Sequence, residues 1–205
     1  MEFEELKEKI VKFVKEELYS LEPWIYSCEW DEKLPKLNEL REKVKKMGLW
    51  LPQISTDYGG IGLSLQEHGE ISEILGGSPY GFYVFNCQAP DAGNMEILIE
   101  VGTSQQKKDY LTPLLEGKTR SCFAMTEPGY AGSNPTRMGT IAKKENGNYI
   151  INGHKWFTSS FDGADFAIVM VVTDPDEANP YKRASQIIVP TKTEGVEFVR
   201  NVSIM

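Results

Sequence analysis

The first part of the chain has the apolar spacing of helices. In FEELKEKIVKFVKEEL (3–18) the apolar residues recur every three or four positions, which predicts an amphipathic helix. A second helix is expected to start after Pro35 and to end at Gly48, because proline suits the first turn of a helix and glycine suits its end.

Three further helices follow in the same pattern. Ser64 can cap a helix that ends at Gly76, since a serine hydroxyl accepts a bond from a backbone N–H of the first turn. Residues 79–101 predict another helix, interrupted near Pro90. Ser104 is expected to cap the last helix of this half.

The pattern then changes to short runs that alternate or are rich in β-branched and aromatic residues, which predict strands. The runs are RSCFAMT, RMGTIAKK, YIINGHKWFTSS, ADFAIVMVVT, ASQIIVP and GVEFVR. Asn146-Gly147 lies between two of them and predicts a tight hairpin turn. Because the strands all follow the helices, we expect an α+β fold: an all-α helical domain over 1–118, then a small antiparallel β domain over 119–205.

Charge and hydropathy exclude some classes of function. The chain of 205 residues has 22 basic and 30 acidic residues and a net charge of -8, which disfavours nucleic acid or an anionic membrane as a general partner. No apolar stretch approaches the roughly 18 residues that span a bilayer. The acidic, amphipathic N-terminus lacks the order of a signal peptide.

Cysteine and histidine are sparse. Three cysteines are widely spaced without a CxxC motif, which predicts reduced thiols and a cytoplasmic protein. His68 and His154 stand far apart with no cysteine or acidic cluster beside them. We therefore expect no metal site.

One candidate site is the stretch RSCFAMTEPGYAGSNPT (120–136), where a strand meets a loop rich in glycine and proline. Thr126 and Ser133 offer hydroxyls, while Gly129 and Gly132 let backbone N–H groups approach a ligand closely. Such a loop can hold a phosphate or the polar edge of a heterocycle. The alternative is an ordinary surface turn. It is neither a Walker loop nor a GxGxxG loop, because no GK[ST] and no helix pattern follow.

A second candidate is GHKWFTSS (153–160), which places two aromatic residues before three hydroxyls. In a strand, Trp156 and Phe157 would face opposite ways, and Ser159 would share the face of Phe157. A ring and a hydroxyl on one face could contact the plane and the edge of a flat ligand. The alternative is a core aromatic in a sheet.

Together, and in this order after a helical half, these segments resemble the acyl-CoA dehydrogenase family over roughly residues 35–200. Met125-Thr126-Glu127-Pro128 followed by Gly132-Ser133-Asn134 is similar to the family pattern of Thr-Glu-Pro and then Gly-Ser-Asp. The family also has a Gly-x-Lys followed by an aromatic and a hydroxyl residue, represented here by Gly153, Lys155, Trp156-Phe157 and Ser159. The helical segments 47–76 and 100–128 resemble the family as well.

The resemblance implies a helical domain and a small β domain that hold FAD between them. By this resemblance, the backbone of Phe123–Met125 and the hydroxyl of Thr126 would contact the polar edge of the flavin. Phe157 would pack against the flavin ring, and Ser159 would hydrogen-bond flavin N5. Ser133 would lie by the pyrophosphate and the CoA end of the substrate. The implied cofactor-binding residues are Phe123, Ala124, Met125, Thr126, Gly132, Ser133, Phe157 and Ser159. Asn134 replaces the family's usual aspartate.

The activity implied by the resemblance is oxidation of an acyl-CoA thioester at its α,β carbons to a 2-enoyl-CoA. The flavin accepts the hydride, because no amino acid can, and a carboxylate takes the α proton. In the family this base is a glutamate on a C-terminal helical domain. The sequence stops at VSIM, part-way through the expected β domain. We therefore expect the C-terminal helical domain to be absent, and we assign no catalytic residue. Electrons would pass to an electron-transfer flavoprotein or to oxygen, and the complete protein would be a homo-oligomer.

Three hypotheses of different classes remain open from the sequence. The chain is the N-terminal part of an FAD-dependent acyl-CoA dehydrogenase, one subunit of a split enzyme, or a non-catalytic binding protein that retains the fold. If neither FAD nor any acyl-CoA changed the thermal stability of the chain, the third hypothesis would be favoured, since a ligand that binds only the folded state stabilises it.

Overall fold

The computed structural model describes residues 2–132 and 134–203. The chain folds into two compact units, the first ending at Ala92 and the second starting at Gly93. The domain boundary predicted between residues 118 and 119 divides the chain by secondary structure, whereas these two units divide it by compactness. The predicted boundary therefore stays a prediction. Among the described residues, no helix is long and apolar enough to cross a membrane.

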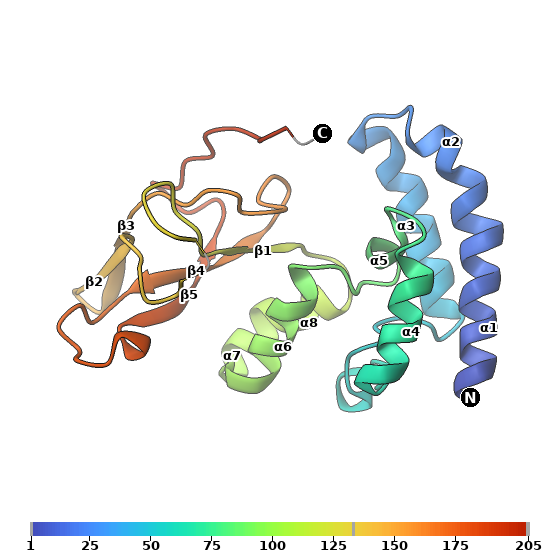
Figure 1. The fold of residues 1–205 in the computed structure, drawn as a ribbon, viewed down its shortest axis with the longest axis horizontal. Helices are drawn as coiled ribbons and strands as arrows, with labels where there is room; N and C mark the ends of the chain where they lie inside the picture. Colours follow the sequence, from blue (N-terminus) through green and yellow to red (C-terminus); the bar gives the residue numbers. More distant parts are fainter. Residues whose placement is uncertain (1, 133, 204–205) are drawn as a thin grey trace. The chain divides into compact units, whose positions relative to one another are not determined.

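The first unit is helical (Figure 1). Its apolar positions at helical spacing fill a core in which Ile10, Leu40 and Ile71 are fully buried. Helix α1 contacts α4, and α3 contacts α5. The helical segments are α1 (Phe3–Phe13), a π-helical continuation (Val14–Leu18), a 3₁₀ turn (Tyr19–Leu21), α2 (Glu22–Ile25), α3 (Trp30–Lys46), a 3₁₀ turn (Thr56–Tyr58), α4 (Leu65–Leu75) and α5 (Gly81–Val84).

The predicted cap at Ser64 is confirmed. The backbone N–H of Glu67 donates to Ser64 Oγ at 3.3 Å, and the N–H of Ser64 donates to Glu67 Oε2 at 2.8 Å. This reciprocal arrangement satisfies two backbone donors at the start of α4.

Two predicted helix starts are wrong. α3 begins at Trp30 and runs through Pro35, because a proline there removes only its own hydrogen bond and the flanking turns hold the helix. The helix after residue 102 is capped by Thr103, since Thr103 Oγ1 accepts from Gln106 N–H at 3.2 Å and Gln106 Oε1 accepts from Thr103 N–H at 2.9 Å. The T-x-x-Q spacing was the sequence signal for this cap.

The second unit combines short helices with a sheet of five strands. α6 follows Pro90, so residues 79–101 hold two helices separated at the predicted interruption. The segments are α6 (Asp91–Val101), α7 (Ser104–Gln106), a π-helical turn (Lys107–Leu111), α8 (Thr112–Leu115), β1 (Ser121–Ala124), β2 (Ile141–Glu145), β3 (Asn148–Asn152), β4 (Phe166–Val172), a 3₁₀ turn (Pro180–Lys182) and β5 (Ala184–Pro190).

The sheet is mixed, so the prediction of an antiparallel β domain is wrong in this respect. β4 pairs in parallel with β1 and antiparallel with β5 (Figure 1). β2 pairs antiparallel with β3 and meets β4 in parallel where Ile141 pairs with Val172. A parallel pair needs a long crossover connection, and the hairpin and loops between β1 and β4 provide it.

The predicted hairpin turn is confirmed between β2 and β3. Asn146 has φ of 52° and Gly147 has φ of 84°, the two positive angles of a tight hairpin turn. The runs at 153–160 and 195–200 were expected to be strands, and the structure has none there. At 153–160 the positive φ of Phe157, 50°, is incompatible with an extended strand.

Candidate functional site

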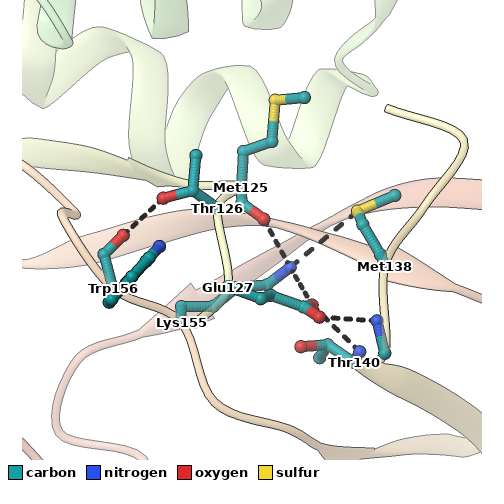
Figure 2. Close-up of polar contacts among 8 residues, drawn as sticks. Met125, Thr126, Glu127, Met138, Thr140, Lys155 and Trp156 are labelled. Atoms are coloured by element: carbon teal, nitrogen blue, oxygen red, sulfur yellow. Dashed lines mark hydrogen bonds and ion pairs between the residues drawn. The ribbon is translucent and has the colours of Figure 1, made fainter. Parts of the chain in front are cut away.

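The end of β1 lies beside the segment that follows β3 (Figure 2). The backbone N–H of Trp156 donates to the carbonyl of Thr126 at 3.0 Å. The Thr126 hydroxyl donates to the carbonyl of Trp156 at 2.6 Å. The Lys155 ammonium donates to the carbonyl of Met125 at 2.8 Å. These three bonds fix the register between two segments 30 residues apart in the sequence.

A buried ion pair lies behind these contacts. Lys155 Nζ is 2.7 Å from Glu127 Oε1, and the two side chains are only 11% and 5% exposed. The carboxylate also accepts from the backbone N–H of Gly139 at 2.5 Å and of Thr140 at 2.9 Å. A buried carboxylate is stable only with such partners, so Glu127 joins three segments of the chain in one cluster.

The carboxylate of Glu127 is ionised at neutral pH. Burial raises the pKa of Glu127, but the hydrogen bonds from Lys155 and from the backbone of Gly139 and Thr140 outweigh it and lower the pKa to about 2. Burial lowers the pKa of Lys155, and the carboxylate opposes that effect. A carboxylate with so low a pKa holds a proton poorly, which makes Glu127 unsuited to act as a general base.

Thr126 presents one hydrogen-bond donor and one acceptor. Its hydroxyl proton is directed at the Trp156 carbonyl, so the oxygen keeps lone pairs to accept from a ligand. Its backbone N–H makes no hydrogen bond with another described residue. Because the peptide is planar and trans, the Met125 carbonyl that points at Lys155 turns this N–H the opposite way. A ligand edge with a carbonyl next to an N–H matches this pair.

Two glycines allow the loops to pack this closely. A Cβ on Gly132 would lie 2.9 Å from Thr126 Cγ2, which is closer than real side chains come. A Cβ on Gly153 would collide with the side chain of Thr140.

Asn134 Oδ1 accepts from the N–H of Thr136 at 3.0 Å, so the Asn134 side chain stabilises the loop itself.

Two aromatic rings stand at the surface next to Thr126. The rings of Trp156 and Phe157 lie 4.7 Å apart between centroids, tilted at 46°. They are 40% and 63% exposed, so neither is a core aromatic. The predicted common face of Phe157 and Ser159 on a strand does not apply, because this segment is a loop. Ser159 is exposed and its side chain makes no hydrogen bond within the described part of the chain.

The structure brings some predicted site residues together. Met125, Thr126 and Gly132 lie at the junction with Trp156, and Phe157 follows directly. Phe123 and Ala124 belong to β1, where Ala124 is buried. Ser133 lies outside the described residues.

The pairing of Glu127 with Lys155 is the feature that sequence reasoning missed. Both residues stand inside the motifs quoted above, but neither was assigned a role. Glu127 stands between Thr126 and Pro128, and Lys155 stands between His154 and Trp156, so neither local sequence indicates a buried charge. Their separation of 28 positions hid the contact.

The chain is an α+β protein, in which helices precede a mixed sheet and the end of β1 contacts the segment after β3. Comparison with known proteins identifies its family. Residues 1–118 match the model of the acyl-CoA dehydrogenase N-terminal domain, and residues 122–203 match that of the acyl-CoA dehydrogenase middle domain. The chain belongs to the acyl-CoA dehydrogenase family.

Similar proteins agree with this membership. The chain is 40% identical over 211 aligned positions to acyl-CoA dehydrogenase family member 10 of Mus musculus, covering 97% of the chain and 20% of the relative. It is 41% identical over 175 positions to a protein described as the acyl-CoA dehydrogenase FadE2 of Mycobacterium tuberculosis, covering 83% of the chain and 42% of the relative.

A solved structure described as an acyl-CoA dehydrogenase from Mycobacterium abscessus superposes with a TM-score of 0.91 at 34% identity, over 98% of this chain and 53% of that one. The chain therefore spans about half the length of this structure, and less than half that of the curated relatives described above.

Proposed function

We propose that this chain forms the flavin-binding part of an FAD-dependent acyl-CoA dehydrogenase, which oxidises acyl-CoA thioesters at the α,β carbons to 2-enoyl-CoA. The observation that supports it best is the donor and acceptor pair of Thr126, because the pyrimidine edge of a flavin has a carbonyl next to an N–H. A glutaryl-CoA dehydrogenase from Mycobacterium smegmatis, 26% identical with a TM-score of 0.70, was solved in complex with FADH2.

The proposed roles follow from the positions of the side chains. When bound, FAD supplies the acceptor for the β hydride. Thr126 binds the flavin edge through its N–H and its hydroxyl oxygen. The exposed ring of Phe157 packs against the flat ring system, and the unengaged hydroxyl of Ser159 bonds to flavin N5. Gly132 brings its loop close to Thr126. The role of Ser133, at the pyrophosphate and the CoA end of the substrate, is proposed from the family motif alone.

The base for the α proton is proposed to come from elsewhere. Glu127 is buried in its ion pair and has a pKa of about 2, so it is not assigned this role. The relatives extend well beyond the matched region, and we place the base in the part of the whole protein that corresponds to that extension. The electron acceptor is an electron-transfer flavoprotein or oxygen, and the whole protein is a cytoplasmic homo-oligomer.

Binding of FAD to the chain tests the cofactor proposal. FAD fluorescence is titrated with the wild type, with Thr126→Val and with Thr173→Val. The control variant also loses a hydrogen-bonded hydroxyl, that of Thr173 to Ser185 at 2.7 Å beyond β4. We expect Thr126→Val to bind FAD about tenfold more weakly, the size of one good hydrogen bond, and Thr173→Val to bind as the wild type does. Absence of binding by the wild type, or equal binding by all three proteins, would contradict the proposal.

A further inference from the structure

We propose that Glu127 and Lys155 are positioning residues that set the direction of the peptide between Met125 and Thr126 and so aim the Thr126 N–H at the flavin. This inference rests on the proposed function, and it gives the buried ion pair a role in binding beyond holding the loop. Neither side chain touches the ligand in this proposal. Both act through Thr126.

The ammonium of Lys155 selects one orientation of this peptide. It has only donors, and it bonds to the carbonyl of Met125 at 2.8 Å (Figure 2). If the peptide plane turned over, the Thr126 N–H would face the ammonium, donor against donor, and the Met125 carbonyl would face the ligand. A flavin carbonyl would then meet an acceptor in place of a donor. The charged donor therefore disfavours the orientation that cannot bind.

Glu127 in turn holds the ammonium in place. Its Oε1 accepts from Lys155 at 2.7 Å and from the N–H of Thr140 at 2.9 Å, and its Oε2 accepts from the N–H of Gly139. Met138 Sδ lies 3.9 Å from the same ammonium. Lys155 is thus confined by groups from two other segments, and a long flexible side chain becomes a fixed donor.

The backbone of Lys155 connects this pair to the aromatic side of the site. Trp156, the next residue, exchanges two hydrogen bonds with Thr126, at 3.0 and 2.6 Å. A shift of Lys155 therefore moves the Thr126 hydroxyl and the loop of Phe157 together. The ion pair couples the polar edge of the proposed site to its exposed ring.

The test compares Lys155→Met with Lys118→Met. Lys118 forms an exposed pair with Glu116 at 2.7 Å in the same unit, with side chains 71% and 48% exposed, and serves as the matched control. We expect Lys155→Met to weaken FAD binding about tenfold or more, since a hydrogen bond from a charged donor is lost and the N–H is no longer held. The reduction potential of bound FAD should also fall, because a positioned N–H stabilises the negative charge of the reduced ring. Lys118→Met should change neither quantity.

A second variant distinguishes a loss of FAD binding from a loss of folding. Removing one partner of a buried pair leaves an unpaired charge, whereas removing both does not. The double variant Glu127→Gln/Lys155→Met is therefore expected to fold and still to bind FAD about tenfold more weakly, with the lowered potential. If the double variant matches the wild type in affinity and potential, the positioning role is overturned and the proposed function stands. If the wild type does not bind FAD, the proposed function fails, and this inference fails with it.

Discussion

Replacing Glu127 by glutamine tests the energetic role of the buried ion pair. Glutamine keeps the shape of the side chain and one acceptor for Lys155, but it removes the negative charge. The pKa of Glu127 falls from its ordinary value of 4.5 to about 2. At about 1.4 kcal/mol per pKa unit, the ionised carboxylate stabilises the fold by about 3 kcal/mol. The loss of one partner from a buried pair is of the same size, about 3–5 kcal/mol.

The effect has a defined dependence on pH. Because the pKa of Glu127 is lowered by folding, its contribution is fully present above pH 4.5 and is lost as pH falls towards 2. We therefore expect Glu127→Gln to be less stable than the wild type by about 3 kcal/mol at pH 7, and we expect this difference to shrink below about pH 5.

Urea unfolding followed by circular dichroism measures this difference. The wild type, Glu127→Gln and Glu116→Gln are compared at pH 7, 5, 4 and 3. Glu116 belongs to an exposed pair, so its substitution should change the free energy of unfolding by less than about 0.5 kcal/mol. A Glu127→Gln variant as stable as the wild type at pH 7, or a difference that does not change with pH, would show that the ionised carboxylate does not stabilise the fold.

Two further predictions concern local packing and capping. Gly153→Ala should lower the stability by about 1–3 kcal/mol in thermal unfolding, because the new Cβ collides with Thr140. Gly129→Ala is the control and should have a much smaller effect, because its Cβ meets nothing within 4 Å. Ser64→Ala should cost about 1 kcal/mol in urea unfolding, because the N–H of Glu67 loses its acceptor, and an unchanged midpoint would show that the cap contributes nothing.

Much of the fold follows from local signals in the sequence. The cap at Ser64 and the turn at Asn146-Gly147 depend on residues adjacent in the chain, and both predictions are confirmed. The direction of the β1–β4 pair could not be predicted, because it is set by a long connection and not by the pattern of either strand. The helix through Pro35 shows neighbouring turns overriding a single unfavourable residue.

The sequence indicates the two segments that form the candidate site, but not the contacts between them. Thr126 belongs to one motif, Lys155 and Trp156 belong to the other, and the structure joins the two motifs by hydrogen bonds. Lys155 and Trp156 make the contacts between the motifs, and the left-handed φ of 50° at Phe157 shows that their segment is not the expected strand. The ion pair of Glu127 and Lys155 joins residues whose proximity only the folded chain reveals.

Binding of FAD at Thr126 is measured by the amide signal of this residue in a ¹H–¹⁵N spectrum recorded while FAD is added. The N–H of Thr126 makes no bond within the described residues, so it is available to a ligand. We expect this signal to shift downfield to a saturating value as FAD binds, together with the signals of Trp156 and Phe157. If FAD binds and the Thr126 signal stays in place, or if no signal of this loop responds to FAD, the proposed site is wrong.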